Sequence, residues 1–194
     1  MLSDFVNRIN GTMDVIVVSY GGSGSTTLSN ILTKNGYKFE DDHMYRKYLC
    51  HYPDYIALDI PIIYIYDDPK HSLLSMRRRG DGIWNINQDK LGLLKPTKHE
   101  HSDENLLRLM IDQFHKWTSE EHDNVLVIHT RELFQQSIKT KLDKFLKKDL
   151  KHLPVSYIKP KTNMSHVTQD NIELFNKYSS YINHINTFQP QKKI

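Results

Sequence analysis

The sequence predicts an α/β fold in which a mainly parallel sheet has helices on both faces, a three-layer sandwich. Three short apolar runs, at residues 15–18, 60–66 and 125–129, are typical of strands buried on both sides. Segments with helical periodicity separate these runs along the chain. Such alternation indicates a parallel sheet, and ligands of such sheets bind at the carboxyl ends of the strands.

The first strand leads into a glycine-rich turn and a helix. The run at 15–18 is followed by the loop 19–27, Ser-Tyr-Gly-Gly-Ser-Gly-Ser-Thr-Thr, and by a helical pattern that stops at Asn35 and Gly36. Glycines let the backbone approach a ligand closely, and a helix N-terminus offers unpaired N–H groups to an anion. The loop therefore predicts a phosphate or sulfate site; the alternative is a glycine-rich turn that binds nothing. The expected contacts come from Gly21, Gly22, Ser23, Gly24, Ser25, Thr26 and Thr27.

The segment before the central strand is predicted to hold a short strand at 37–40 and a helix at 41–48, which Pro53 prevents from continuing. The run at 60–66 has the length of a central strand, and Asp67 begins the turn that ends it. A helix is expected at 70–79, with its buried side formed by Leu73, Leu74 and Met76.

The second half of the chain begins with the least regular stretch. Residues 80–101 are expected to form a loop around the substrate. A helix then opens at Ser102, and its apolar stripe recurs at three- and four-residue steps through Leu106, Met110, Phe114 and Trp117. Further helices are expected at 136–148 and 169–186, the second with the apolar face Ile172, Phe175, Tyr178 and Ile182.

Composition indicates one domain and excludes several classes of function. The chain has 194 residues, of which 38% are hydrophobic and 25% charged, and its net charge is +3. No apolar stretch approaches the roughly 20 residues that a membrane span needs, and the basic excess is small for a nucleic-acid partner. The single cysteine, Cys50, and the absence of a signal-peptide pattern favour a cytoplasmic location. Basic runs at 77–79 and 139–151 favour small anions as ligands.

Four motifs, taken in order, resemble the P-loop sulfotransferase family. The loop 19–28 is similar to that family's phosphosulfate loop, typically Ser-Tyr-Pro-Lys-Ser-Gly-Thr-Thr. The segment 51–53 resembles its His-Leu-Pro element, and 62–75 resembles its 3′-phosphate element through Pro69, Lys70 and Ser75. Trp117 followed by 125–133 resembles its late strand and the turn after it.

This resemblance implies a single domain of P-loop (nucleoside-triphosphate-hydrolase-like) topology over 1–194, with a loosely ordered N-terminus at 1–12 and a tail at 187–194. It implies transfer of a sulfuryl group from 3′-phosphoadenosine-5′-phosphosulfate to a hydroxyl or amine of a small molecule, saccharide or peptide, leaving adenosine 3′,5′-bisphosphate. His51 is then the catalytic base, and no metal is expected. The alternative for His51 is a cap on a proline turn, and that for Ser75 is an ordinary helix-surface serine.

Two cations of the family pattern are missing. Gly22 stands where the family has the loop lysine, and Asp67 stands where it has the arginine that binds the 3′-phosphate. A carboxylate facing a phosphate is repulsive. The candidate replacements are Arg77, Arg78, Arg79, Lys159 and Lys161, although the arginine run also fits a solvated helix end.

Two other classes of function remain open. An ATP- or GTP-binding P-loop enzyme of kinase or NTPase type would use Asp67 to hold magnesium, but the sequence lacks the Gly-x-x-x-x-Gly-Lys-Ser/Thr loop. A nucleotide-binding protein that has kept the fold without turnover would explain both missing cations. The histidines show no zinc-ligand spacing with cysteines or carboxylates.

Overall fold

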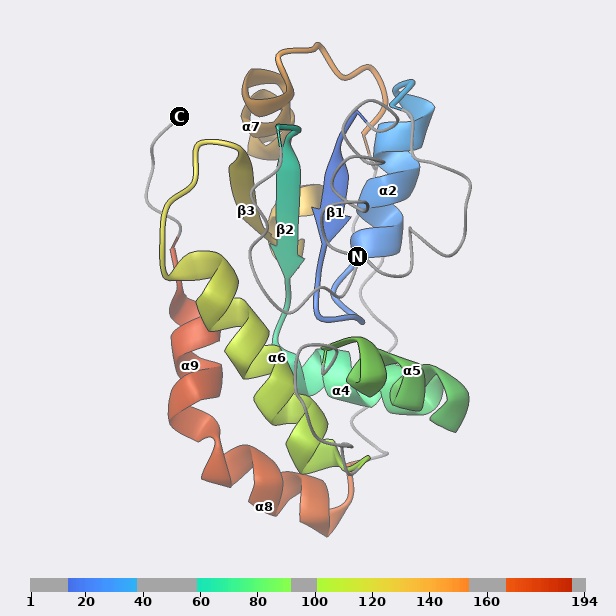
Figure 1. Cartoon of the computed structure of the whole chain (residues 1–194), viewed down its shortest axis with the longest axis vertical. Coiled ribbons are helices and arrows are strands. Elements are labelled where there is room, and N and C mark those ends of the chain that lie inside the picture. Colours follow the sequence, from blue (N-terminus) through green and yellow to red (C-terminus); the bar gives the residue numbers. More distant parts are fainter. Residues whose placement is uncertain (1–13, 38–58, 92–100, 154–166, 190–194) are drawn as a thin grey trace.

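The computed structural model describes residues 14–37, 59–91, 101–153 and 167–189. Strands and helices alternate in the first part of the chain, and helices dominate the second part (Figure 1). In chain order the elements are β1 (Ile16–Val18), α2 (Ser25–Lys34), β2 (Ile62–Tyr66), α4 (Pro69–Arg78), α5 (Asp81–Leu91), α6 (Asp103–Thr118), β3 (Val125–His129), the 3₁₀ helix η1 (Thr130–Phe134), α7 (Ser137–Leu146), α8 (Gln169–Lys177) and α9 (Ser179–Thr187).

Within the described residues the sheet has three parallel strands in the order β1-β2-β3. Ile16 pairs with Ile62, and Tyr66 pairs with His129. The predicted α/β class, the parallel sheet and the central place of β2 are confirmed. Of the strand predicted at 37–40 only Tyr37 is described, and it is not in a strand; the helix predicted at 41–48 lies outside the described residues.

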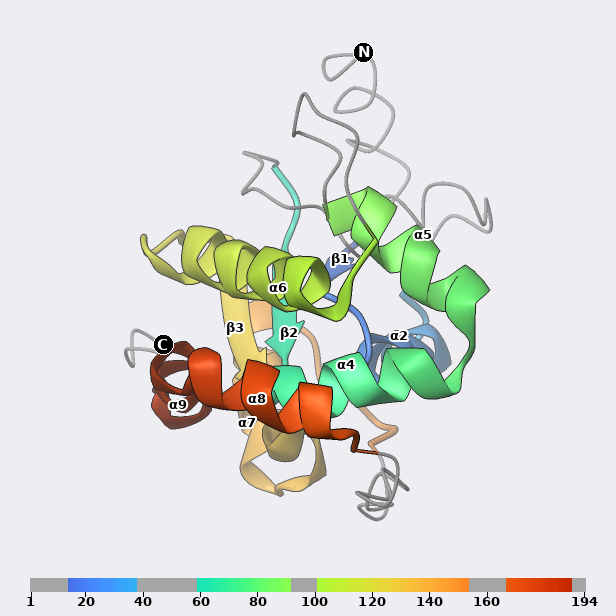
Figure 2. The same cartoon turned by 90° about the horizontal axis from the view of Figure 1, so that it is seen from below.

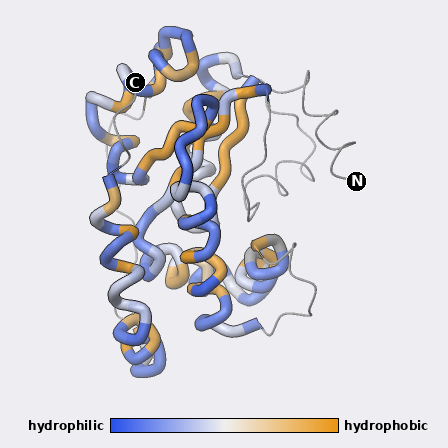
Figure 3. Tube along the Cα trace, turned by 60° about the vertical axis from the view of Figure 1, so that its left-hand side comes forward, coloured by the Kyte–Doolittle hydropathy of each residue, from blue (hydrophilic) through white to orange (hydrophobic). Residues whose placement is uncertain are grey.

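Helices cover both faces of the sheet, as the sequence predicts (Figure 2). Because side chains alternate along a strand, Tyr64 and Tyr66 pack among α4, α6 and α9, while Ile63 and Ile65 pack among α2, η1 and α7. Figure 3 shows the hydrophobic strands at the centre, with helices that carry both polar and apolar segments around them. No helix of the described part is long and apolar enough to cross a membrane.

The helix α6 confirms its predicted stripe. Leu106, Met110, Phe114 and Trp117 are all buried. The Trp117 ring stacks on Tyr64 with centroids 5.6 Å apart and an interplanar angle of 6°. This stack fixes α6 against the central strand.

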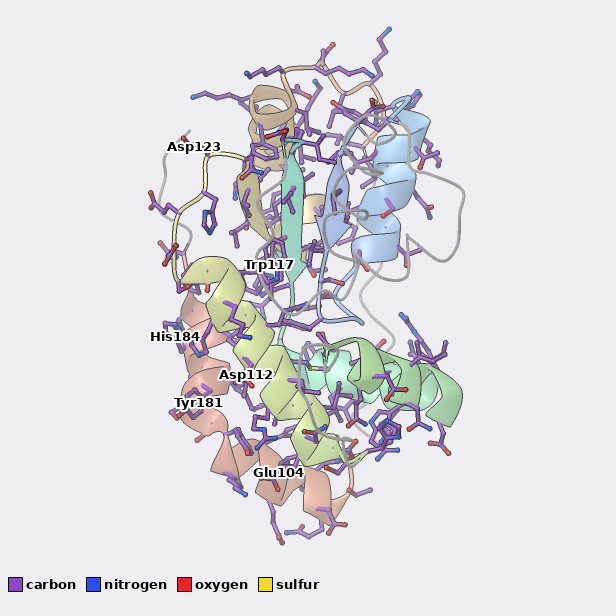
Figure 4. All side chains as sticks on the ribbon, viewed as in Figure 1. Glu104, Asp112, Trp117, Asp123, Tyr181 and His184 are labelled. Carbon is purple, nitrogen blue, oxygen red and sulfur yellow. The ribbon has the colours of Figure 1, made fainter. Side chains whose placement is uncertain are left out.

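The contact between α6 and the C-terminal helices combines an ion pair with stacked rings. Figure 4 labels Glu104 on α6 and His184 on α9. Glu104 of α6 accepts hydrogen bonds from Lys177 (2.6 Å) and from the hydroxyl of Tyr178 (2.9 Å). Near the C-terminal end of α6, the rings of His115 and His184 stack with centroids 5.6 Å apart and an interplanar angle of 18°. The Glu104 contacts join α6 to the end of α8, and the ring stack joins α6 to α9.

The prediction of an irregular loop at 80–101 is wrong for its first half, since Asp81–Leu91 is the helix α5. Trp84, Gln88 and Leu91 are buried at four- and three-residue steps, a helical spacing that the nearby glycines obscure in the sequence. The Arg77 guanidinium lies 3.7 Å from the Trp84 ring centroid and so ties α5 to α4. Residues 92–100 lie outside the described part.

The helix predicted at 169–186 is two helices. Tyr178 leaves helical geometry, with φ −103° and ψ 15°, and α9 starts after it. Phe175 and Ile182 are buried as predicted, but Ile172 is 44% exposed, so the buried face of α8 does not include it. Beyond α9, the Phe188 carbonyl accepts a hydrogen bond from the Tyr66 hydroxyl (3.2 Å).

Candidate anion-binding site

The loop between β1 and α2 has the backbone geometry of an anion cradle. Gly21, Gly22 and Gly24 have φ of 89°, 67° and 81°, values that side chains other than glycine rarely tolerate. Gly24 is the N-cap of α2, no side chain caps this helix end, and its first turn holds no acidic residue. The first N–H groups of α2 are therefore open to an anion, and the helix dipole favours negative charge there.

The hydroxyl residues of the loop divide into two groups. Thr26 and Thr27 are exposed, and Ser25 is half-buried, so their hydroxyls are accessible to a ligand at the start of α2. Ser23 is fully buried, and its hydroxyl donates to the carbonyl of Ile65 (3.2 Å). The Ser23 side chain thus anchors the loop to β2.

A threonine that was not predicted as a site residue fastens the loop to β3. The Thr130 hydroxyl lies 2.6 Å from the Ser23 carbonyl and 3.0 Å from the Tyr66 carbonyl. Thr130 directly follows β3, so its place at the carboxyl edge of the sheet is the signal that could have identified it.

A second clamp joins the loop to the segment after β2. The Tyr20 hydroxyl donates to the carbonyl of Asp67 and accepts the N–H of Asp67 at 2.9 Å. Burial raises the pKa of Tyr20 well above its ordinary value, so the phenol stays neutral and can act as both donor and acceptor. The clamp holds the loop and the Asp67 backbone together at the edge where β1 and β2 end.

Gly22, which aligns with the loop lysine of the sulfotransferase pattern, has no room for a side chain. A Cβ at this position would lie 2.8 Å from the carbonyl oxygen of Ser72 in α4. Gly24 is also tight, because its Cβ would lie 3.1 Å from the Thr130 side chain. The loop is therefore closely packed against neighbouring elements on two sides.

Asp67 is buried at the carboxyl end of β2. Burial raises the pKa of Asp67, while the N–H of Asp68 and the nearby imidazoles of His129 and His71 act in the opposite direction. One carboxylate oxygen accepts the Asp68 N–H at 2.8 Å. Burial thus favours the protonated form of Asp67, which repels an anion less than the carboxylate does.

Asp68 has a structural role beside this site. Its carboxylate accepts the N–H of Lys70 (2.8 Å) and so caps α4, and it also accepts from the Asn186 amide of α9 (3.0 Å). Asp68 thereby joins α4 to the end of the last helix.

The arginines predicted to replace the two missing cations lie at the end of α4 that is away from the loop. Arg77 pairs with Asp103 at 2.7 Å and with Asp81 at 3.5 Å, so its charge is used at the junction of α4, α5 and α6. Arg78 and Arg79 lie at this same C-terminal end of α4, whereas Ser72, nearer its N-terminal end, meets the loop. Ser75 is buried in α4, one turn beyond Ser72. His51, Lys159 and Lys161 lie outside the described residues.

Among the described residues, no group of three or more His, Cys, Asp or Glu side chains is arranged to hold a metal ion. Comparison with known proteins found no matching family model, no matching curated protein and no matching solved structure. The loop and the residues that contact it are therefore the features of the chain that bear on its function.

Proposed function

We propose that the chain binds the phosphate groups of a nucleotide at the loop 19–27 and acts as a sulfotransferase dependent on 3′-phosphoadenosine-5′-phosphosulfate. The observation that carries the proposal is the uncapped N-terminus of α2 behind three glycines of positive φ. Such a helix end, at the carboxyl edge of a parallel sheet, is suited to bind phosphate.

The arrangement of the motifs supports this proposal over a generic turn. Three of the four segments that resemble the sulfotransferase family meet at the loop. Tyr20 bonds to Asp67 of the segment 62–75, and Ser23 accepts from Thr130 of the segment 125–133. Segments that are distant in sequence thus contact the loop, which supports the proposal.

The proposed chemistry needs few groups. The α2 amides and the hydroxyls of Thr26 and Thr27 stabilise the negative charge that grows on the leaving phosphate. His51 takes the proton of the acceptor hydroxyl or amine as that atom attacks sulfur. Without a lysine at position 22, charge stabilisation falls to the amides, the hydroxyls and the helix dipole.

A second candidate is a magnesium-nucleotide enzyme of kinase or NTPase type. The observation that favours it is the carboxylate of Asp67 at the end of β2, held beside the loop by Tyr20. An aspartate in this place would hold a magnesium ion, and the ion would supply positive charge to the nucleotide phosphates.

Ligand-induced thermal stabilisation distinguishes the two candidates. Adenosine 3′,5′-bisphosphate should raise the melting temperature in the absence of magnesium, whereas ATP or GTP with magnesium should have a smaller effect. A shift with a magnesium nucleotide and none with the bisphosphate would favour the second candidate. No shift with any of them would contradict both.

A charge placed at the loop tests the site itself. Thr26→Asp adds a carboxylate to the first turn of α2, where the helix dipole tolerates it and a bound phosphate does not. The variant should stay folded and lose most of its affinity for the bisphosphate. Asn30→Asp, an exposed position of the same helix, is the matched control and should bind normally.

Catalysis requires a separate measurement. His51→Ala should abolish formation of adenosine 3′,5′-bisphosphate from the sulfuryl donor with a panel of phenol and amine acceptors, and it should leave bisphosphate binding nearly unchanged. Retained turnover in this variant would remove the role assigned to His51.

A further inference from the structure

Lysines gather where the helices α2 and α7 end. Lys34 is the last residue of α2, and Lys144 lies in the last turn of α7. With the lysines that follow α7 they form an exposed group, the lysine surface, which consists of Lys34, Lys144, Lys147, Lys148 and Lys151. The ends of both helices lie at the top of Figure 1, whereas the loop 19–27 lies at the opposite edge of the sheet. The lysine surface is therefore separate from the proposed anion site.

Hydrogen bonds of Asn35 join the two helix ends into one surface. The side-chain oxygen of Asn35 accepts the N–H groups of Lys151 (2.7 Å) and His152 (3.0 Å). Its amide group donates to the His152 carbonyl (2.8 Å). Because Lys34 directly precedes Asn35, the lysines of the segment 147–152 are held beside the end of α2.

The carboxylates of the α7 segment are already bound to a different lysine. Asp143 and Asp149 both pair with the ammonium group of Lys139. Asp14 is a further carboxylate at this end of the molecule, and its charge acts on the hydroxyl of Tyr37. Within the part of the chain that the structure describes, no member of the lysine surface lies within ion-pair distance of a carboxylate. The lysine surface thus keeps an excess of positive charge.

Lys147 has a backbone conformation that lysine rarely adopts. Its φ is 53° and its ψ is 37°, and it is the one residue other than glycine with a positive φ among those described. Glycine is the usual residue at this place after a helix, because it has no Cβ to cause strain. The cation that the helix dipole favours in the last turn is already supplied by Lys144. Strained positions concentrate at functional sites, so the charge of Lys147 points to a partner.

The chemistry of the lysine surface fits an anionic lipid surface. The large apolar side chains that are exposed in the described part lie on α5, α8 and α9, and these are Ile83, Ile86, Ile172 and Tyr181. This end therefore offers no such side chain as an anchor for a protein partner or as a stacking platform for a base. Lysine ammonium groups are point charges, without the planar geometry by which arginine reads bases and phosphates. Clusters of roughly four to eight basic residues attract anionic lipids by charge alone.

We propose that the lysine surface is a peripheral docking site for a membrane rich in anionic lipid. The phosphate and carboxylate groups of the lipid headgroups attract the ammonium groups, and no part of the chain needs to cross the bilayer. The loop 19–27 then faces away from the membrane, because it lies at the opposite edge of the sheet. The inference does not rest on the proposed function, since neither the loop nor its ligand takes part in docking.

Two variants separate docking from folding. The first combines Lys144→Gln, Lys147→Gln and Lys151→Gln; Lys148 is kept, because its Nζ lies 4.5 Å from the ring centroid of Tyr37. The second, Lys147→Gly, removes one charge and relieves the backbone strain, so it should melt at or above the wild-type temperature. A matched control removes three exposed charges from α4 and α6 through Arg79→Gln, Arg108→Gln and Lys116→Gln.

The experiment is sedimentation of the full chain with phosphatidylcholine vesicles that contain or lack phosphatidylserine. The wild type should bind the phosphatidylserine vesicles at low salt and lose this binding at high salt, which screens the charges. Lys147→Gly should bind roughly fivefold more weakly, and the triple lysine variant on the order of a hundredfold more weakly, because each lysine near the surface contributes separately. The control should stay within about threefold of the wild type.

Three results would overturn the inference. The first is equal binding of the wild type to both kinds of vesicle, or binding to neither. The second is an equal loss of binding in the control and in the triple lysine variant, which would assign the effect to net charge. The third is displacement of the protein from the vesicles by a short DNA duplex at equal phosphate concentration, which would assign the surface to nucleic acid. Bisphosphate binding is measured without vesicles, so the proposed function is tested separately.

Discussion

The position that a Cβ of Gly22 would occupy lies 2.9 Å from the Cα of Ser72, so the loop and α4 meet through backbone atoms. This contact explains why the loop has no lysine at the place where the sulfotransferase pattern has one. A side chain at position 22 would need both a rare φ of 67° and a displacement of α4. The packing of the loop against α4 thus leaves no room for a lysine at position 22.

Substitution of Gly22 should therefore destabilise the fold. Gly22→Ala should lower the free energy of unfolding by about 2 kcal/mol or more, because backbone strain and overpacking add. Gly80→Ala is the matched control, since φ there is 95° and nothing lies within 4 Å of the added Cβ. It should cost about 1 kcal/mol, from strain alone. Equal losses in urea denaturation would contradict the contact with Ser72.

Removal of the Thr130 hydroxyl should weaken both the fold and the site. Thr130→Val keeps the side-chain shape but loses the bond to Ser23, at a cost of about 1–2 kcal/mol. Bisphosphate affinity should fall as well, because the loop loses an anchor. Thr33→Val, which loses a hydrogen bond to Ser29 within α2, is the control and should bind normally. Unchanged affinity in Thr130→Val would show that the clamp does not hold the loop in its binding conformation.

The strands and most helices could be predicted because their signals are local. The run at 62–66 is fully buried, and Ser102 caps α6 through the Asn105 N–H as its place in the sequence indicates. The helix α5 was missed because tertiary contacts of Trp84, with Arg77 and Asp103, stabilise a segment with glycines at its start.

The glycine-rich turn at 19–27 was predictable from the sequence, but its packing against neighbouring elements was not. The glycines and hydroxyl residues of 19–27 predict a turn from the sequence alone, because glycines favour the positive φ values that such a turn needs. The buried, anchoring role of Ser23 and the contact of Gly22 with Ser72 depend on how β3 and α4 approach the loop. These contacts join residues that are far apart in the sequence, so the spacing of motifs along the chain does not predict them.

Arg77 should prove structural, not a ligand contact. Arg77→Lys keeps the charge but loses the planar stack on Trp84 and the Nε bond to Asp103, and should cost about 1 kcal/mol of stability. Bisphosphate affinity should not change. Arg79→Lys, at the exposed C-cap of α4, should change stability by less than about 0.5 kcal/mol. Weaker bisphosphate binding in Arg77→Lys, without a loss of stability, would show that Arg77 contacts the ligand.

Neutralising Asp67 should stabilise the protein in a way that depends on pH. Burial raises the pKa of Asp67, so stability is highest when the group is protonated and is lost as pH rises through the folded pKa. Asp67→Asn keeps an oxygen for the Asp68 N–H and should gain about 1 kcal/mol at pH 7. The gain should vanish near pH 3. A gain that is the same at both pH values would contradict the raised pKa.

The stacked pair His115 and His184 should make the contact between α6 and α9 sensitive to acid. Burial and the neighbouring His184 lower the pKa of His115, whereas Asp112 acts against them. The neutral ring is therefore favoured in the fold, and its stability is present above the ordinary histidine pKa and lost as pH falls through the lower folded value. Because the ring is partly exposed, the effect should be only about 0.5 kcal/mol. His115→Phe keeps an aromatic ring without a titrating group and should flatten the stability profile between pH 7 and pH 5, measured by urea denaturation. His152→Phe, at an exposed position, should leave that profile as in the wild type, and equal flattening in both variants would place the acid sensitivity elsewhere.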